Sequence, residues 1–365
     1  MHYLNYIGDF RSGFGYGVHT ANFYEALKKH YPLIKYEYEG QMSQADFYDM
    51  VRQRSASVPG KSINMHIGSP VDYQYMQDHL GGITIGFTPV DYDYIYPIAR
   101  EVYETIDRIW VPTSWGKKIL INNGLSEKKI DVVPEGFDPE VFFSTERKLD
   151  KPYFEFITVG KLEDRKGLDI LVKAFEKAFE NEKAVRLHLL IANKFDPNID
   201  YEAFLAACGV KHREKYILYP DIVSTQTIAD LYRSCDADVF TTRSEGWGLP
   251  IVDAMASGLP TIVTNYSAQT DYIHQKNAYL LDYKEVRNQS KQFLTFSGLP
   301  HALEYFGNWA EPDSDHLIAL FRKIFKYREK ARKIGDASAQ DMLKNWTWDC
   351  AAKKAKLILD NISSA

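Results

Sequence analysis

A carboxylate stands in a glycine-rich turn in the second half of the sequence. Glu245 lies in the run SEGWGLPIVDAMASGLP (residues 244–260), which follows the apolar segment 237–241. Gly246 and Gly248 allow the backbone to turn tightly and to approach a ligand closely. The apolar segment is typical of a buried strand, and ligands of open parallel sheets bind just outside the carboxyl ends of such strands. Glu245 is therefore a candidate for contact with a bound ligand.

A helix is predicted directly after this turn. Pro250 suits the first turn of a helix and Gly258 suits its end, so Asp253, eight residues after Glu245, lies near the first turn. The N-terminus of such a helix offers N–H groups to an anion. The alternative is a purely structural strand, turn and helix, with a solvated Glu245 and an Asp253 that only offsets the helix dipole.

A second charged turn carries two lysines. The run TVGKLEDRKGLDIL (residues 158–171) follows an apolar segment and opens a helix, with Lys161 and Lys166 five residues apart. Two cations at such a turn can converge on one pyrophosphate. The alternative is a solvated basic turn whose charges are balanced by Glu163 and Asp164.

The run around Glu245 resembles the Glu-x7-Glu motif of the retaining glycosyltransferases of family four, which have the two-domain GT-B fold. The resemblance implies that Glu245 faces the donor sugar and that Asp253, one methylene shorter than the family's Glu, binds the nucleotide ribose. It also implies that Lys161, where the family has Arg, and Lys166 hold the donor diphosphate. The rest of the donor-binding loop would be Gly246, Trp247, Gly248 and Leu249.

A glycine-rich turn, GFGYG (residues 13–17), lies near the N-terminus. It fails as a dinucleotide-binding fingerprint because Val18 stands where the last glycine is required, which disfavours a dinucleotide oxidoreductase. Glu37 and Glu39 lie near the spacing at which such enzymes hold a ribose, so this exclusion is weak. The turn resembles the glycine-rich first turn of the family-four transferases, and Gly15 is our candidate for a backbone contact with the donor phosphate or the acceptor.

Two residues are candidates for the acceptor side. His66 lies in NMHIGSP (residues 64–70), where many family relatives carry His-x-His, and Gly68 occupies the second His position. A structural role for His66 is the alternative. Asp91 follows the apolar segment 83–87 and is expected to line the acceptor site. A retaining transfer does not require a protein base, since the departing diphosphate can accept the acceptor's proton on the same face.

Two Asp-x-Asp tripeptides raise the question of a metal. They begin at Asp91 and Asp236 and match the pattern by which the other large glycosyltransferase fold holds a divalent ion on the donor phosphates. Such tripeptides are common by chance, and the two lysines already supply positive charge. We therefore expect no metal and no other cofactor.

The elements that position these residues follow from hydrophobic periodicity. Short apolar runs alternate with amphipathic helical patterns, which predicts an α/β protein with parallel sheets. We expect two facing Rossmann-like domains with a deep cleft between them, 1–145 on the acceptor side and 151–345 on the nucleotide-sugar side, with a linker at 144–152. One long helix is predicted over 314–332. The last helix, at about 346–365, is expected to return to the first domain, as the resemblance implies.

Composition excludes several classes of protein. The 365 residues are 45% hydrophobic and 25% charged with a net charge of −5, so no basic surface for nucleic acid is indicated. The three cysteines are not closely spaced, which disfavours a disulfide framework and suits a reducing compartment. Without a signal peptide or a long apolar run, the chain is expected to be soluble and cytoplasmic. Peripheral membrane contact stays open.

These features together predict a hexosyltransferase of glycan biosynthesis. It would move a sugar from a UDP- or GDP-sugar to a growing glycan or glycoconjugate, with retention of configuration and without metal. A nucleotide-sugar epimerase of the same fold is one alternative. A catalytically inactive nucleotide-sugar-binding protein is another, and the changes at Lys161, Gly68 and Asp253 keep it open.

Overall fold

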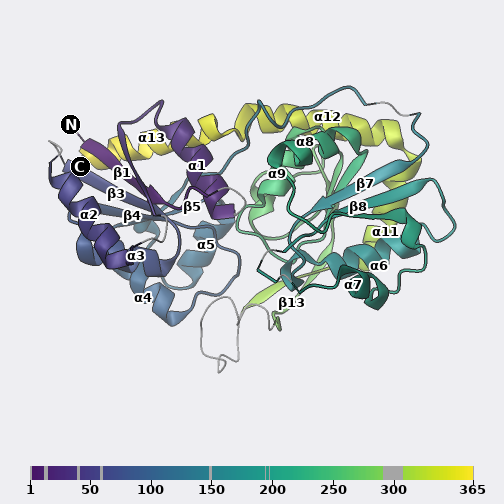
Figure 1. Ribbon diagram of the computed structural model, residues 1–365, viewed down its shortest axis with the longest axis horizontal. Coiled ribbons are helices and arrows are strands. Elements are labelled where there is room, and N and C mark those ends of the chain that lie inside the picture. Colours follow the sequence, from purple (N-terminus) through teal and green to yellow (C-terminus); the bar gives the residue numbers. More distant parts are fainter. Residues whose placement is uncertain are drawn as a thin grey trace. The chain divides into compact units, whose positions relative to one another are not determined.

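The computed structural model describes residues 2–11, 15–38, 42–57, 61–147, 150–193, 195–196, 198–290 and 307–364. Gly13 of the first glycine-rich turn lies outside these ranges. The chain forms two compact units (Figure 1), of which unit 1 contains Met1–Asp138 and Trp346–Ala365 and unit 2 contains Pro139–Asn345. In the ranges described, no helix is long and apolar enough to cross a lipid bilayer.

Unit 1 is built on a six-stranded sheet in the order β2-β1-β3-β4-β5-β6, with every neighbouring pair parallel. Its strands are β1 (His2–Gly8), β2 (Leu33–Glu37), β3 (Lys61–Ile67), β4 (Ile83–Phe87), β5 (Arg108–Val111) and β6 (Ile130–Val132). Because the strands are parallel, their carboxyl ends meet at one edge of the sheet. That edge carries Gly15, His66 and Asp91, each at or just after a strand end.

Helices cover the faces of the unit 1 sheet. They are α1 (Gly15–Leu27), α2 (Gln44–Ala56), α3 (Pro70–His79), α4 (Pro97–Thr105), α5 (Ser114–Asn122), the 3-10 turn η1 (Glu127–Lys129) and α13 (Trp348–Ser364). Figure 1 shows α13 alongside α1, although the two lie at opposite ends of the sequence. The Trp348 ring centroid lies 5.5 Å from that of His19, and the Tyr31 and Ser363 hydroxyls are 2.9 Å apart. The last helix is thus an integral part of unit 1.

Unit 2 contains a second sheet of six parallel strands, in the order β12-β11-β10-β7-β8-β9. Its strands are β7 (Phe154–Val159), β8 (Val185–Leu190), β9 (Tyr216–Leu218), β10 (Ala237–Phe240), β11 (Thr261–Thr264) and β12 (Tyr279–Leu281). Read from the β9 edge, this is the 3-2-1-4-5-6 order of a Rossmann sheet, whose ligands bind where the order reverses. The reversal lies between β7 and β10, the strands that precede Lys161 and Glu245.

The helical layers of unit 2 pack around an aromatic core. Its helices and turns are η2 (Asp164–Lys166), α6 (Leu168–Ala178), α7 (Tyr201–Ala207), η3 (Arg213–Lys215), α8 (Thr225–Ser234), α9 (Leu249–Ala256), η4 (Ser267–Asp271), α11 (Ser314–Lys326) and α12 (Arg328–Asn345). The Phe321 ring of α11 lies 5.0 Å from Phe156 and 5.7 Å from Phe175. Two further strands, β13 (Tyr283–Arg287) and β14 (Asn308–Pro312), pair antiparallel.

The prediction of one continuous helix over 314–332 is wrong. The helix ends at Tyr327, whose backbone leaves the helical region, and α12 begins directly after it. The reason lies in packing, because α11 lies against α6 whereas α12 lies against α9. Because α11 and α12 pack against different helices, the chain changes direction between them.

The chain enters unit 2 between Asp138 and Pro139, before the predicted linker at 144–152. The residues that follow are fixed to unit 2. Arg147 donates hydrogen bonds to four carbonyl oxygens at the ends of α8 and α9, those of Tyr232 (3.0 Å), Arg233 (3.2 Å), Cys235 (2.9 Å) and Ser257. Because these contacts hold the segment on unit 2, its charged and turn-rich composition does not mark the boundary.

Candidate functional site

The two charged turns identified in the sequence meet at the carboxyl ends of β7 and β10. Gly167, between η2 and α6, has a φ of +61°, and a Cβ there would lie 2.1 Å from the Thr241 carbonyl oxygen. Only glycine allows both this left-handed backbone and this close approach. The Arg243 N–H also donates to the Arg165 carbonyl at 2.7 Å. The fold therefore joins residues 163–167 to residues 241–245.

Glu245 lies at the centre of this junction and is only 5% exposed. Its Oε1 accepts hydrogen bonds from Lys166 Nζ at 2.6 Å and Thr242 Oγ1 at 2.9 Å. Its Oε2 accepts one from Arg165 Nη1 at 2.8 Å. The Glu245 N–H donates to Ser267 Oγ at 2.9 Å. The carboxylate is thus held by the 165–166 turn and by Thr242, and its backbone is held by Ser267.

The charge of Glu245 is stabilised by its two cationic partners. Burial raises the pKa of this carboxyl group, but the attraction of Arg165 and Lys166 and their hydrogen bonds outweigh burial and lower the pKa to about 2. An ionised carboxylate is purely an acceptor of hydrogen bonds. Glu245 can therefore accept from ligand hydroxyl groups or stabilise a developing positive charge, and at neutral pH it has no proton to donate.

Lys161 and Lys166 have different partners in this structure. The Lys166 stem runs past Gly160, where a Cβ would lie 3.5 Å from Lys166 Cδ, and its ammonium reaches Glu245. The Lys161 ammonium lies 3.2 Å from Glu163 Oε2 and 5.1 Å from the centre of the Phe195 ring, and its side chain is 40% exposed. Both lysines follow the end of β7, but their ammonium groups form ion pairs with different carboxylates, Glu163 and Glu245.

The helix after Glu245 begins as predicted, with fewer available N–H groups than expected. Gly248 caps α9 with a φ of +93°. Pro250 has no N–H, and the N–H groups of Ile251 and Val252 donate to the Gly248 carbonyl at 2.9 and 3.3 Å. Only the amides up to Leu249 can face a ligand, so we expect α9 to attract an anion less strongly than a fully open helix N-terminus.

The remaining predicted donor residues surround the start of α9. Gly246 is buried, and Trp247 is buried against Tyr272, with ring centroids 5.0 Å apart. The Tyr272 hydroxyl also donates to the Trp247 carbonyl at 2.6 Å. Asp253 is half-buried in the second turn of α9. Trp247 therefore stabilises the loop by packing, whereas Asp253 is partly exposed and its contact with the ribose stays a prediction.

Sequence reasoning missed three residues that hold Glu245. They are Arg165, Thr242 and Ser267. Arg165 stands beside Lys166 and could have been found by counting the cations of that turn. Ser267 has a φ of +64°, unusual for a residue other than glycine, and such strain is typical of functional positions. No sequence pattern marks it beyond its place after an apolar strand.

At the corresponding edge of unit 1, the glycine-rich turn opens helix α1. Gly15 is the first residue of α1, and a Cβ there would have nothing within 4 Å. Gly17 is the glycine that the fold requires, because its Cβ would lie 1.8 Å from the Arg11 carbonyl oxygen. Packing therefore gives no reason for glycine at position 15, and a backbone contact with ligand remains a prediction.

His66 has a structural partner. The ring is 6% exposed, and its Nδ1 forms a hydrogen bond with the Tyr48 hydroxyl. Burial lowers the pKa of His66, and the Asp72 charge opposes that effect. A Cβ at Gly68 would lie 2.7 Å from Asp72 Oδ2 and 3.0 Å from His66 Nε2. The space that a second histidine would need is therefore already filled.

Asp91 is half-buried in the segment that joins β4 to α4, at the same edge of the sheet as Gly15 and His66. Its acceptor-side role stays a prediction. Among the described residues, no three His, Cys, Asp or Glu side chains cluster as metal ligands would. Asp236, in the second Asp-x-Asp tripeptide, pairs with Lys151 at 2.8 Å.

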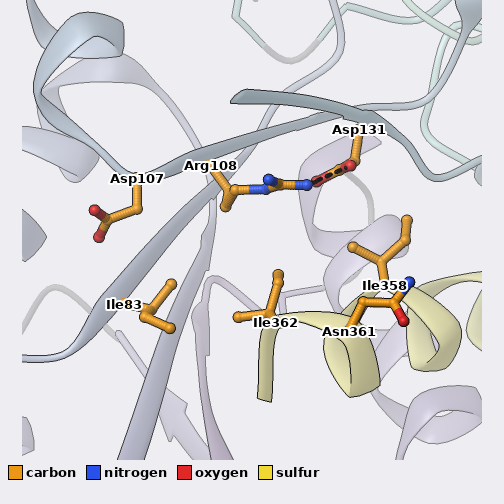
Figure 2. A pocket seen from close by; sticks show the side chains of 7 residues that line it. All are labelled: Ile83, Asp107, Arg108, Asp131, Ile358, Asn361 and Ile362. Atoms are coloured by element: carbon orange, nitrogen blue, oxygen red, sulfur yellow. Dashed lines mark hydrogen bonds and ion pairs between the residues drawn. The ribbon is translucent and has the colours of Figure 1, made fainter. Parts of the chain in front are cut away.

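A separate hollow of about 420 Å³ lies at the opposite edge of the unit 1 sheet. Figure 2 shows Arg108 directed at Asp131, with Ile358 and Ile362 of α13 on the other side. Arg108 and Ile83 are the first residues of their strands. The hollow therefore lies away from the carboxyl edge, and its arginine is already paired with a carboxylate at 2.7 Å.

The comparison with known protein families finds a match within unit 2. Residues 140–313 match the glycosyl transferases group 1 family. This group 1 segment contains both charged turns, and so it contains Lys161, Lys166, Glu245 and all the residues that hydrogen bond to Glu245. The matched segment begins next to the first residue of unit 2.

Individual relatives are similar over part of their length. Mannosylfructose-phosphate synthase of Agrobacterium fabrum is 30% identical over 178 residues, which are 45% of this chain and 38% of that protein. An uncharacterised glycosyltransferase of Bacillus subtilis is 24% identical over 247 residues, 67% of this chain and 58% of that protein. The chain thus matches less than two thirds of the length of either relative.

Solved structures resemble the whole chain. Sucrose-phosphate synthase of Thermosynechococcus elongatus has a TM-score of 0.71 at 13% identity, covering 100% of this chain and 99% of that one. Anabaena HepE in complex with UDP and glucose has a TM-score of 0.70 at 13% identity, covering 100% of both chains. With the two parallel sheets, these likenesses confirm the predicted two-domain α/β fold of the GT-B type.

Proposed function

We propose that this chain transfers a hexosyl group from a UDP- or GDP-sugar to a glycan or glycoconjugate, with retention of configuration and without a metal. The observation that carries the proposal is the buried Glu245, held by Lys166 and Arg165 at the reversal point of the unit 2 sheet. The group 1 match and a relative named for a sugar-phosphate synthase activity support the same reaction class.

In this proposal, cations of unit 2 bind the donor diphosphate. Lys166 would exchange Glu245 for a phosphate oxygen, and the half-exposed Lys161 would contribute a second charge. Fixed positive charge at the leaving group stabilises the charge that develops there as the glycosidic bond breaks. Asp253, in the second turn of α9, would bind the nucleotide ribose.

Glu245 would act on the transferred sugar. Its carboxylate orients sugar hydroxyls and stabilises positive charge at the anomeric carbon as the diphosphate leaves. The acceptor oxygen then bonds to the anomeric carbon on the face that the diphosphate vacates. The acceptor proton passes to a diphosphate oxygen on that face, so the step needs no protein base. The structural role of His66 in its bond with Tyr48 is consistent with this route.

A donor screen tests the proposal. UDP-, GDP- and ADP-sugars are offered to the purified protein, each with and without EDTA, and hydrolysis and epimerisation are followed by NMR. We expect hydrolysis of a UDP- or GDP-sugar that persists in EDTA. Complete loss in EDTA with recovery in manganese would refute metal independence and favour Asp91. A donor epimerised without acceptor would identify an epimerase, and binding without turnover would identify a binding protein.

Two variants test the assigned roles. Glu245→Gln is expected to lower kcat by about 10² or more without weakening nucleoside diphosphate binding, because the contacts of Glu245 with the sugar strengthen at the transition state. Asp253→Asn is expected to weaken nucleotide binding with a smaller effect on kcat, because ribose contacts do not change at the transition state. Full activity of Glu245→Gln, or a product of inverted configuration, would overturn the proposal.

A further inference from the structure

Arg165 contacts the carboxylate of Glu245, but it is held differently from Lys166. Its Nη1 donates to Glu245 Oε2 and to the Ser244 carbonyl, both at 2.8 Å, and its Nη2 donates to Glu163 Oε1 at 2.9 Å. The Arg165 side chain is 15% exposed. A guanidinium with acceptors on both of its terminal nitrogens has a fixed plane and position.

The backbone of Arg165 is also tied to the turn that carries Glu245. Its carbonyl accepts hydrogen bonds from the Arg243 N–H at 2.7 Å and from Thr242 Oγ1 at 3.2 Å. Movement of Arg165 would break these contacts together with those of its side chain. Arg165 and the 241–245 turn therefore form one rigid structure.

Lys166 has a weaker hold on the same carboxylate. Its ammonium donates to a single group, Glu245 Oε1, from a flexible four-carbon stem that runs past Gly160. An incoming dianion can compete for Lys166 at the cost of one hydrogen bond. The same dianion would have to break several contacts to recruit Arg165.

We propose that Arg165 is a positioning residue that keeps Glu245 ionised and oriented while Lys166 moves from Glu245 to the donor diphosphate. This inference rests on the proposed function. In the donor-free state Glu245 has two cationic partners, and with donor bound it has one. The carboxylate then has an oxygen available for the sugar, and Arg165 still balances its charge.

The charged and polar groups that face Glu245 make this inference testable by pH. Arg165 and Lys166 come from η2, Thr242 from the turn of Glu245 itself, and Ser267 from η4, while Glu163 faces Arg165 from the other side. If Lys166 leaves Glu245 for the donor, Arg165 is the only cation of this group that still lowers the pKa of Glu245. Its removal should raise that pKa.

The experiment compares Arg165→Met, Lys166→Met and Glu245→Gln with the wild-type chain. UDP and GDP affinities are measured by calorimetry, and kcat is measured against pH with the accepted donor. Arg165→Met should lower kcat by up to about 10²-fold, as expected for a misplaced catalytic group, with nucleotide affinity within about threefold of wild type. The acid limb of its kcat profile should move to higher pH. Lys166→Met should lose nucleotide affinity instead.

A control and a conservative variant complete the design. Arg213→Met removes an arginine of unit 2 that pairs with Glu202 at 2.7 Å, away from this site, and should leave every readout unchanged. Arg165→Lys keeps the positive charge but loses the planar guanidinium with its two terminal nitrogens. The acid limb of the kcat profile should therefore stay near that of wild type while kcat falls. This variant decides the question if Arg165→Met does not fold.

Two results would overturn the inference. Arg165→Met could weaken nucleotide binding as strongly as Lys166→Met, which would make Arg165 a phosphate ligand. It could also leave kcat and the acid limb unchanged, which would make it a structural residue. Full activity of Glu245→Gln is a different outcome, because it would refute the proposed function itself.

Discussion

The depressed pKa of Glu245 predicts a specific loss of stability in acid. Glu245→Gln removes the titrating group and keeps nearly the same shape. The pKa falls from 4.5 to about 2 in the folded chain. One pKa unit corresponds to about 1.36 kcal/mol, so a difference of about 2.5 pKa units contributes about 3 kcal/mol to the stability of the folded chain. Because the folded pKa is the lower one, this contribution is complete above the unfolded pKa and is lost as the pH falls towards about 2.

The magnitude can be followed through the acid range. At pH 5.5 nearly all of the contribution is present, and by pH 3 about 2 of the 3 kcal/mol are gone. Glu245→Gln lacks this pH-dependent contribution to stability. The difference in free energy of unfolding between wild type and Glu245→Gln should therefore shrink by about 2 kcal/mol between pH 5.5 and pH 3. Carboxyl groups distant from Glu245 titrate alike in both proteins and cancel in the difference.

The assay must report on unit 2, because two units need not unfold together. Urea unfolding followed by hydrogen exchange and mass spectrometry of peptides from β7 and β10 meets this need, with both proteins compared at the same pH. Glu311→Gln is the control, since Glu311 pairs with Arg243 at 2.8 Å but is 44% exposed, and such pairs contribute only about 0–1 kcal/mol. A wild-type to Glu245→Gln difference that stays constant from pH 5.5 to pH 3 would refute the reasoning.

Three further substitutions have expected outcomes. Gly167→Ala forces a Cβ to within 2.1 Å of the Thr241 carbonyl oxygen and should cost about 1–3 kcal/mol of stability, which urea unfolding measures; a cost near zero would contradict the close approach. Gly68→His should destabilise unit 1 through the contact with Asp72 and give no gain in turnover, and a stable, faster variant would contradict this. Arg147→Met leaves several carbonyl groups without their donor and should lower the free energy of unfolding of unit 2 by about 1–3 kcal/mol, measured by urea unfolding. An unchanged free energy of unfolding would show that the segment is held in other ways.

Local patterns carried most of the fold prediction. The apolar segment before the lysine turn is β7 (Phe154–Val159), and the strand predicted over 237–241 is β10 (Ala237–Phe240), which ends one residue earlier. Both are mainly apolar runs with one acidic residue each, Glu155 in β7 and Asp238 in β10, and a mainly apolar run is typical of a parallel strand that is covered on both faces. The end of α11 at Tyr327 could not be predicted, because its residues favour a helix and the break comes from neighbours distant in sequence.

The site was predictable in its residues but not in their contacts. Glu245 and Lys166 each stood out by residue type and by position after a strand, yet they are 79 residues apart in the sequence and their ion pair follows only from the sheet order. Arg165 was overlooked because an arginine between acidic and basic neighbours has the pattern of a solvated turn. Its burial depends on the close approach at Gly167, which a sequence does not display.

The position of α13 in unit 1 has a consequence for how the protein is made. A ribosome completes the whole of unit 2, residues 139–345, before it reaches Trp346. Until then the buried faces of His19 and Phe23 lack Trp348, which packs against both rings. Domains generally fold in the order of their synthesis, but here unit 2 has its full sequence first and unit 1 is completed last. The nascent chain therefore carries an unfinished apolar surface throughout the synthesis of unit 2.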